Sequence, residues 1–263
     1  MPQRSVSGTT LNYDERGSGA PLVLLHGFPL DNRIWREQVA ALSDRFRVIT
    51  PDLRGFGQSK SGDSFTMESL ADDVHALLAD LSALPCVLGG LSMGGYVALA
   101  YAKKYPADLL GLVLIDTKAD ADTAEGKAGR EKMIELARAQ GTKAVAEQMM
   151  PKMLAPDAEK SRPQVKRELD QVMNAQSPKT IEHALAAMRD RPDRVADLAS
   201  IRVPALVIVG EHDAITPPAG AEKMSKAIPN STYVVVRGAG HMSPMEQPQQ
   251  VTDVLRRFAS GLS

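Results

Sequence analysis

Three segments of the sequence place a serine, an aspartate and a histidine where a hydroxyl nucleophile could be activated. Ser92 lies in GLSMG (90–94), which has the pattern G-x-S-x-G, Asp213 lies in GEHDAITPP, and His241 lies in GAGHMSP. A serine hydroxyl is a poor nucleophile unless a base can take its proton, and a carboxylate can hold that base in the required tautomer. The order Ser, Asp, His predicts that Ser92 attacks, His241 acts as general base and Asp213 orients the histidine.

The serine turn follows an apolar run, CVLGGLS (86–92), and precedes a helical pattern over 96–104. A sharp strand-to-helix turn would present the Ser92 hydroxyl at the edge of a sheet, with glycines allowing strand and helix to approach. A tightly packed turn or a phosphate-binding turn would also be rich in glycine. Neither G-x-x-x-x-G-K-[ST] nor G-x-G-x-x-G occurs at this turn, so the motif favours the nucleophile.

An oxyanion site is predicted from a second loop, His26-Gly27-Phe28-Pro29, which follows the apolar run 22–25. The predicted donors are the backbone N–H groups of Phe28 and of Met93, the residue after the serine. Their assignment depends on position in the motif, because backbone donors leave no side-chain pattern. His26 is interpreted as a structural loop residue.

Asp116 competes with Asp213 for the role of acid, because it also ends an apolar run, LLGLVLID (109–116). We favour Asp213, since its turn and its spacing before His241 fit the triad better.

Short apolar runs alternate with helical patterns, which is typical of a parallel sheet covered by helices. The predicted fold class is α/β, with a mostly parallel eight-stranded sheet and helices on both faces. Its strands are expected at Ser5–Ser7, Leu11–Glu15, 21–27, 46–52, 86–92, 109–116, 205–210 and 231–236, and its clearest helices at 67–81, 96–104 and 248–258.

Residues 117–200 break this alternation. The segment is alanine-rich and helical in pattern, contains no Phe, Tyr or Trp, and holds six of the 12 methionines. We therefore predict a core of residues 1–116 and 201–263 with a helical cap, or lid, inserted at 117–200. The predicted substrate pocket is apolar and adaptable, because unbranched thioether chains adjust their shape easily. It is lined by Phe28, Met93, Met149, Met153 and Met242.

Composition excludes several other classes of function. The formal net charge of −1 leaves no basic excess for nucleic acid, and the single cysteine, Cys86, allows no intrachain disulfide. No apolar run approaches the ~20 residues of a membrane span, and the first residues have no apolar signal region, so we expect a soluble cytoplasmic protein without a membrane partner. H-E-x-x-H is absent and the five histidines are scattered, so neither metal nor cofactor is expected. The sequence does not indicate the oligomeric state.

These motifs together resemble the α/β-hydrolase superfamily, in particular its small bacterial carboxylesterase, lactonase and cofactor-free haloperoxidase or perhydrolase branch. The resemblance runs through HGFPLDNRIW, PDLRGFGQS, GLSMGGYVAL, GEHDAITPP and GHMSPMEQP, which occur in this order. It implies the same triad and the same oxyanion donors, and it implies that Asp52, Arg54 and Glu246 brace loops around the site. Haloalkane dehalogenases and epoxide hydrolases have an aspartate nucleophile, whereas this chain has Ser92. Perhydrolase-like members often carry tryptophan where Phe28 stands.

The sequence therefore predicts a serine hydrolase of carboxylic esters, including lactones, that acts on a small molecule through an acyl-enzyme. The alternatives are a C–C bond hydrolase, a lyase or a perhydrolase on the same triad, or a ligand-binding protein that keeps the fold without turnover.

Overall fold

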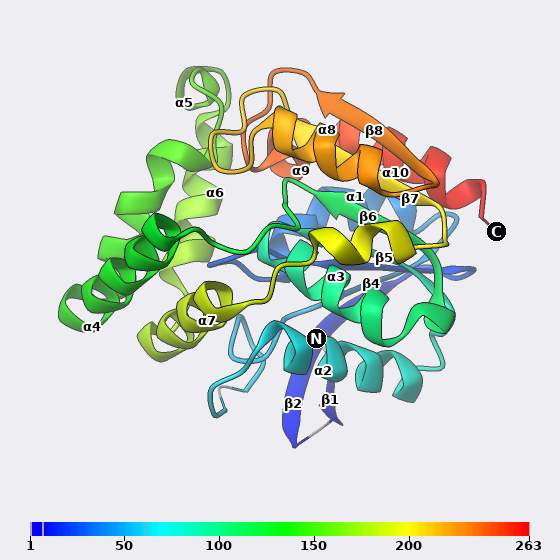
Figure 1. The fold of residues 1–263 in the computed structure, drawn as a ribbon, viewed down its shortest axis with the longest axis horizontal. Coiled ribbons are helices and arrows are strands. Elements are labelled where there is room, and N and C mark those ends of the chain that lie inside the picture. Colours follow the sequence, from blue (N-terminus) through cyan, green and yellow to red (C-terminus); the bar gives the residue numbers. More distant parts are fainter. Residues whose placement is uncertain (1, 7, 61, 263) are drawn as a thin grey trace.

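Eight short strands form one mixed sheet in the computed structural model of the chain, which describes residues 2–6, 8–60 and 62–262 (Figure 1). Their order is β1-β2-β4-β3-β5-β6-β7-β8. The strands are β1 (Gln3–Val6), β2 (Thr9–Arg16), β3 (Pro21–Leu25), β4 (Arg47–Pro51), β5 (Cys86–Leu91), β6 (Leu109–Ile115), β7 (Ala205–Gly210) and β8 (Ser231–Val236). β2 is antiparallel to both of its neighbours, and every other neighbouring pair is parallel. The predicted fold class is confirmed; Ser7, at the end of the first predicted strand, lies outside the described residues.

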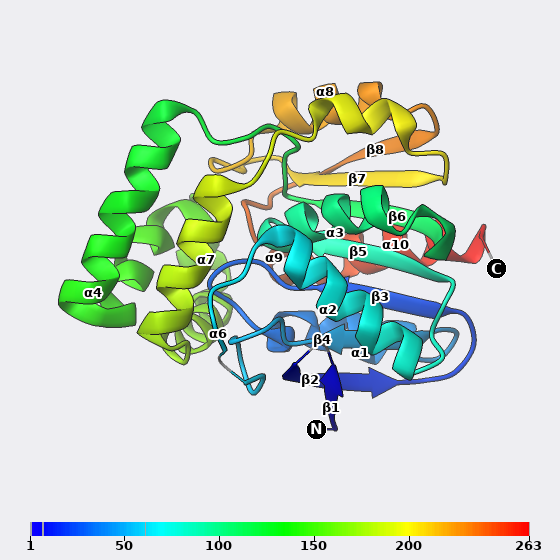
Figure 2. The ribbon, with the colours of Figure 1, turned by 60° about the horizontal axis from the view of Figure 1, so that its bottom comes forward.

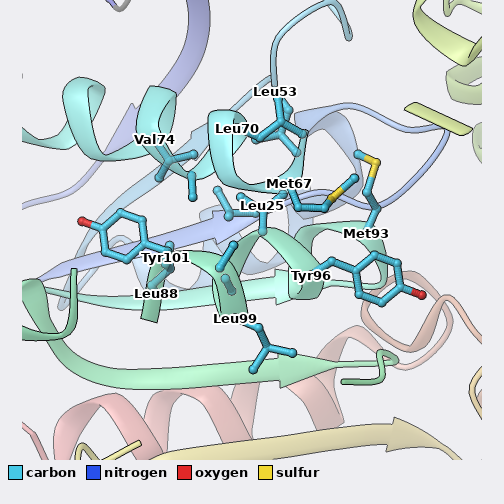
Figure 3. Packing of buried hydrophobic residues seen from close by; sticks show 14 of the residues in the cluster. Leu25, Leu53, Met67, Leu70, Val74, Leu88, Met93, Tyr96, Leu99 and Tyr101 are labelled. Carbon is cyan, nitrogen blue, oxygen red and sulfur yellow. The ribbon is translucent and has the colours of Figure 1, made fainter. Parts of the chain in front are cut away.

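Both faces of the sheet are buried, because alternate side chains of the apolar strands point to opposite sides. Val23 and Leu25 of β3 belong to one core cluster, whereas Leu22 and Leu24 belong to the other. The first cluster packs against α2 (Met67–Asp80), α3 (Met93–Lys104) and α8 (Pro218–Ala227), and the second against α1 (Arg36–Leu42) and α10 (Pro248–Ser260). Figure 3 shows Leu70 and Val74 of α2, Leu88 of β5 and Tyr101 of α3 among the side chains of the first cluster.

The apolar stripe predicted over 67–81 is the buried face of α2. Thr66 caps this helix: its hydroxyl accepts from the Ser69 N–H at 3.1 Å, and the Ser69 hydroxyl accepts from the Thr66 N–H at 2.9 Å. Local capping and side-chain periodicity therefore agree on where α2 begins and which face it buries.

Four helices lie between β6 and β7 in the chain and stack beside one end of the sheet (Figure 2). They are α4 (Ala124–Met153), α5 (Ala158–Ser161), α6 (Pro163–Asn174) and α7 (Pro178–Asp190). α4 is bent at Gly141, whose φ of 78° is not helical, and it packs along α7. We use the word cap for residues 117–200; the predicted division of the chain into a core and a cap stays a prediction.

Short elements complete the chain: the 3-10 turns Asn32–Trp35, Pro106–Asp108 and Val195–Ser200, and α9 (Ser243–Glu246). Among the described residues, no helix combines the length and the apolar character needed to cross a bilayer. The parallel strands β3, β5, β6, β7 and β8 all direct their carboxyl ends to one edge of the sheet. Loops after parallel strands meet at that edge, which is where binding sites of open α/β sheets are found.

Candidate active site

Ser92 lies in a sharp turn between β5 and α3, with φ 52° and ψ −113°. A positive φ is unusual for a residue with a side chain, and such strain is concentrated at functional sites. A Cβ atom added to Gly90 would overlap the carbonyl group of Gly94, and one added to Gly94 would lie 2.5 Å from the carbonyl oxygen of Leu25. These approaches are the physical reason for the two glycines of the G-x-S-x-G pattern.

The structure brings Ser92, His241 and Asp213 together at the carboxyl edge of the sheet. The Ser92 Oγ lies 2.9 Å from the His241 Nε2, and the His241 Nδ1 lies 2.8 Å from the Asp213 Oδ2. His241 and Asp213 are buried, whereas Ser92 keeps part of its surface exposed. The hydroxyl can therefore meet a substrate while its two partners are shielded from water.

Asp213 is held by a turn of its own loop. Its Oδ1 accepts from the N–H groups of Ile215 at 2.8 Å and Thr216 at 2.9 Å, and its Oδ2 accepts from the Thr216 hydroxyl at 2.7 Å. Burial alone would raise the pKa of Asp213, but the hydrogen bond and charge of His241, with the two Thr216 donors, outweigh burial and lower it. An ionised carboxylate accepts from the Nδ1–H of His241, which leaves Nε2 free to receive the Ser92 proton.

The pKa of His241 is set by opposing effects. Burial lowers it, but the hydrogen bond and charge of Asp213, with further charges on Asp116 and Glu246, raise it above its ordinary value of 6.5. A higher pKa makes the imidazole a stronger base. It also means that a smaller fraction of His241 is neutral, and able to accept a proton, at low pH.

The backbone N–H groups of Phe28 and Met93 are the predicted oxyanion donors near Ser92. A Cβ atom added to Gly27 would lie 3.2 Å from the Cβ of Ser92, so the loop that carries Phe28 packs directly on the serine turn. Across the described chain, neither the Phe28 N–H nor the Met93 N–H donates to a protein acceptor. The two N–H groups are thus without a protein acceptor, and their use as oxyanion donors stays a prediction.

His26 holds the loop that carries Gly27 and Phe28. The Leu53 N–H donates to its Nε2 at 2.9 Å, so the ring proton lies on Nδ1, which donates to the Gly27 carbonyl at 2.8 Å. Full burial lowers the pKa of His26, which keeps the ring neutral in this arrangement. These contacts match the structural interpretation of His26.

Asp116 lies in the same region but bonds to other groups. Its Oδ1 accepts from the Gly210 N–H at 2.8 Å, and its Oδ2 accepts from the Ser243 hydroxyl at 2.6 Å and the Ser243 N–H at 3.2 Å. Burial, followed by the charge of Asp213, raises the pKa of Asp116 to about 8. Of the two candidate acids, Asp213 is the one that bonds to the His241 ring.

Comparison with known proteins decides the family. Residues 20–248 match the model of the alpha/beta hydrolase fold. The chain belongs to the α/β-hydrolase family.

Several relatives of this α/β hydrolase have named activities. A thermophilic esterase from Thermogutta terrifontis is 40% identical, with a TM-score of 0.97 over 100% of this chain and 99% of that one. An enol-lactonase from Burkholderia xenovorans LB400 is 30% identical, with a TM-score of 0.92 over 98% and 100% of the two chains. An AB hydrolase superfamily protein from Bacillus subtilis, YisY, is 31% identical over 95% of this chain and 96% of its own. A bromoperoxidase from Bacillus anthracis also shares the fold. The resemblance to the esterase, lactonase and haloperoxidase branch is confirmed.

A groove of about 310 Å³ opens between the two halves of α4 and the loop that carries Asp213. Apolar and charged side chains share its wall, including Met133, Met149, Ile215, Arg130 and Lys152. Arg130 is paired with Asp122, with an Nε–Oδ2 distance of 3.0 Å. The groove gives this α/β hydrolase a mixed rather than a purely apolar surface at Ile215, two residues after Asp213.

The five residues predicted to line the substrate pocket differ in exposure. Met149 is half-buried and lines the groove, whereas Phe28, Met93, Met153 and Met242 are buried in the two core clusters. Their contact with substrate stays a prediction.

Residues that hold the site were missed at the sequence level. Thr216 bonds to Asp213, Ser243 bonds to Asp116, and Gln176 joins the cap to two loops of the core. The spacing Asp-x-x-Thr at 213–216 is a usable signal for a side-chain-capped turn. Ser243 and Gln176 carry no local signal of these contacts, because their partners Asp116 and Asp31 are more than 100 residues away. In the part of the chain that the structure describes, no three His, Cys, Asp or Glu side chains are grouped as a metal site.

Proposed function

We propose that this α/β hydrolase cleaves carboxylic esters, with lactones included as cyclic esters, through an acyl-enzyme on Ser92. The observation that carries the proposal is the continuous line of hydrogen bonds from the Ser92 Oγ through the His241 ring to Asp213, at 2.9 and 2.8 Å. In this arrangement one group can deprotonate the hydroxyl and another can stabilise the imidazolium that results.

Acylation begins when the His241 Nε2 takes the Ser92 proton and the Oγ attacks the ester carbonyl. The carbonyl oxygen becomes an oxyanion, which accepts hydrogen bonds from the Phe28 and Met93 N–H groups. The tetrahedral intermediate then collapses, and the imidazolium of His241 gives its proton to the departing alcohol.

Deacylation repeats these steps with water as the nucleophile. His241 takes a proton from water, the hydroxide attacks the acyl carbon, and the Ser92 oxygen leaves with the proton returned by the imidazolium. The products are a carboxylic acid and an alcohol, or one hydroxy acid from a lactone. Each proton is accounted for by Ser92, His241, water and the leaving group, so the scheme uses no cofactor.

The relatives support the ester and lactone class, since one is an esterase and another is an enol-lactonase, and both align over nearly the whole chain. Members of one fold family catalyse different reactions, so the substrate must be tested on this chain.

We further propose a preference for uncharged acyl groups of short to medium length. Phe28, Met93, Met149, Met153 and Met242 are the proposed apolar contacts, and methionine side chains adapt to different shapes. Arg130 in the groove pairs with Asp122, which also pairs with Lys118 and Arg191. The proposed preference therefore rests on the apolar contacts.

A screen of p-nitrophenyl esters and lactones, with analysis of both products, tests the proposal. We expect release of alcohol and acid by the native chain, and a loss of several orders of magnitude in kcat for Ser92→Ala with the fold retained. A residual acceleration of about 10³ over water is compatible with intact oxyanion donors. Near-normal kcat in Ser92→Ala, or products of C–C cleavage instead of ester cleavage, would contradict it.

A further inference from the structure

Glu246, in the short helix α9, joins the loop that carries His241 to the cap. Its Oε1 accepts from the Gly240 N–H at 2.8 Å, and its Oε2 accepts from the Ala155 N–H at 2.7 Å, across 91 residues of sequence. We propose that Glu246 is a positioning residue that fixes the His241 loop against Ala155 of the cap, so that the base and the groove wall formed by Met149 and Lys152 are set together. The inference rests on the proposed function and deepens it.

The Glu246 carboxylate is almost inaccessible, with 1% of the residue exposed. Burial raises its pKa, and the N–H groups of Ala155, Gly240 and Met242, together with the charge of Arg162 on the cap, act in the opposite direction. A buried carboxylate whose two oxygens each accept from a backbone N–H has a defined orientation, because loss of either donor leaves an oxygen unsatisfied. One of these donors, the Gly240 N–H, immediately precedes His241, so the carboxylate holds the histidine loop directly beside the base.

The cap and the histidine loop are also in direct contact at Gly240. A Cβ atom added there would lie 2.5 Å from both the Ala155 nitrogen and the Leu154 carbonyl carbon. Only a glycine lets the two backbones approach so closely, so a shift of the cap end would be transmitted to the residue next to His241.

The same end of the cap contributes to the groove. Met149 and Lys152 line it from the last turns of α4, immediately before the segment that Glu246 holds. Ile215 lines it from the Asp213 loop. A variant that loosens the Glu246 contacts should therefore alter acyl-chain selectivity as well as the rate of the chemical step.

Gln176 is a second buried side chain that joins the cap to the core, away from the His241 loop. It provides a matched control for Glu246. The Gln176 amide nitrogen donates to the Asp31 Oδ2 at 2.9 Å, and its amide oxygen accepts from the Gly57 N–H at 3.0 Å. Both partners belong to core loops, and neither Gln176 contact involves the His241 loop. Gln176→Ala thus removes a cap anchor of similar burial without removing a bond to the histidine loop.

Glu246 also differs from Gln176 in charge. The acidic groups that face His241 are Asp213 after β7, Asp116 after β6 and Glu246 on α9, and all three raise its pKa. Glu246 is itself faced by Arg162. Replacing Glu246 with neutral glutamine should lower the pKa of His241, so that the acid limb of kcat/KM moves to lower pH.

The experiment compares the native chain, Glu246→Gln, Gly240→Ala and Gln176→Ala on p-nitrophenyl acetate, butyrate and octanoate between pH 5 and 9. For Glu246→Gln we expect kcat to fall by up to about 100-fold, since small misplacements of a catalytic group cost about that much. We also expect a changed ratio of octanoate to acetate turnover, and an acid limb at lower pH. Gln176→Ala should leave the acid limb in place and lower kcat by less than Glu246→Gln.

Native kcat and an unmoved acid limb in folded Glu246→Gln would overturn the inference, as would the same kcat loss and pH shift in Gln176→Ala. If circular dichroism shows that Glu246→Gln does not fold, Gly240→Ala tests the inference in its place. This variant keeps the Glu246 carboxylate but forces the cap away from the His241 loop, so kcat should fall. A native kcat in Gly240→Ala would overturn the inference. Absence of ester turnover by the native chain is a separate result, because it contradicts the proposed function itself.

Discussion

The exchange of Asp213 for asparagine tests how His241 is oriented. The Asp213 Oδ1 accepts from two backbone N–H groups, those of Ile215 and Thr216, at 2.8 and 2.9 Å. In the variant these donors require the amide oxygen at that position, so the amide nitrogen must replace Oδ2, 2.8 Å from the His241 Nδ1. The NH2 group would then donate to Nδ1. The imidazole proton would move to Nε2, where it faces Ser92 and blocks proton abstraction.

The magnitude follows from the loss of the correct tautomer. A triad with the wrong histidine tautomer loses up to about 10⁴ in kcat, which corresponds to about 5 kcal/mol in the activation free energy. The fold should persist, because both backbone donors keep an acceptor.

Asp116→Asn is the matched control, since it makes the same exchange in a neighbouring buried carboxyl group. The exchange leaves the carboxylate that bonds to His241 unchanged, because the His241 Nδ1 lies 2.8 Å from Asp213 and not from Asp116. The amide oxygen can still accept from the Gly210 N–H and the amide nitrogen can donate to the Ser243 hydroxyl, so the bond that is lost is the longer one from the Ser243 N–H, at 3.2 Å. We expect kcat within about tenfold of the native value, a change of no more than about 1.4 kcal/mol.

The assay is the initial rate of p-nitrophenyl butyrate hydrolysis at pH 7 and 8, with melting temperatures to verify folding. The expected ratio of the two kcat losses is about 10³ or more, with Asp213→Asn the slower enzyme. The reverse order would assign the acid to Asp116. Equal and small losses would refute the argument that a carboxylate orients His241.

Three other predictions concern pH, metals and substrate size. Because the neutral form of His241 is the base and its pKa is raised above 6.5, kcat/KM should rise with pH through a midpoint above 6.5; a midpoint well below that value in a pH–rate profile would contradict the predicted charge environment. Activity should survive dialysis against EDTA, because the scheme moves protons only between the triad, substrate and water; loss on chelation with recovery on adding zinc would overturn it. Along a p-nitrophenyl ester series, each buried methylene should add up to ~0.8 kcal/mol until the pocket is full, so kcat/KM should peak at short or medium length. A maximum at palmitate, or a strong preference for anionic acyl groups, would show that the cap was misinterpreted.

Much of the fold could be predicted from periodicity, since strand and helix patterns are local. Runs such as 86–92 and 109–116 are apolar at every position because helices cover both faces of the sheet, and they form β5 and β6 nearly as expected. The bend at Gly141 was not predicted, because alanine-rich sequence on both sides continues the helical pattern and only the left-handed φ breaks it.

The candidate site was predictable where one motif carries its own geometry. The serine turn is an example, since Gly90 and Gly94 report the close approach of strand and helix. The choice between Asp116 and Asp213 was harder, because both follow parallel strands that are neighbours in the sheet, β6 and β7. Asp213 bonds to His241 and Asp116 bonds to Ser243 because of how the His241 loop lies against the two strand ends. No local sequence pattern indicates the position of that loop.

The cap contacts were beyond local inference for the same reason. Glu246 bonds to Ala155 across 91 residues, and Gln176 bonds to Asp31 across 145 residues. The donors to Glu246 are backbone N–H groups. Every residue except proline has such a group, so the sequence does not indicate which residue donates.

The central claim, that Ser92 is the activated nucleophile, is tested most directly by covalent labelling with a fluorophosphonate probe followed by peptide mass spectrometry. The account predicts one adduct, on the peptide that contains Ser92, and loss of ester turnover in proportion to labelling. It also predicts that Asp213→Asn slows labelling far more than Asp116→Asn does. An unlabelled but folded native protein, or an adduct on another residue with Ser92 unmodified, would contradict the account.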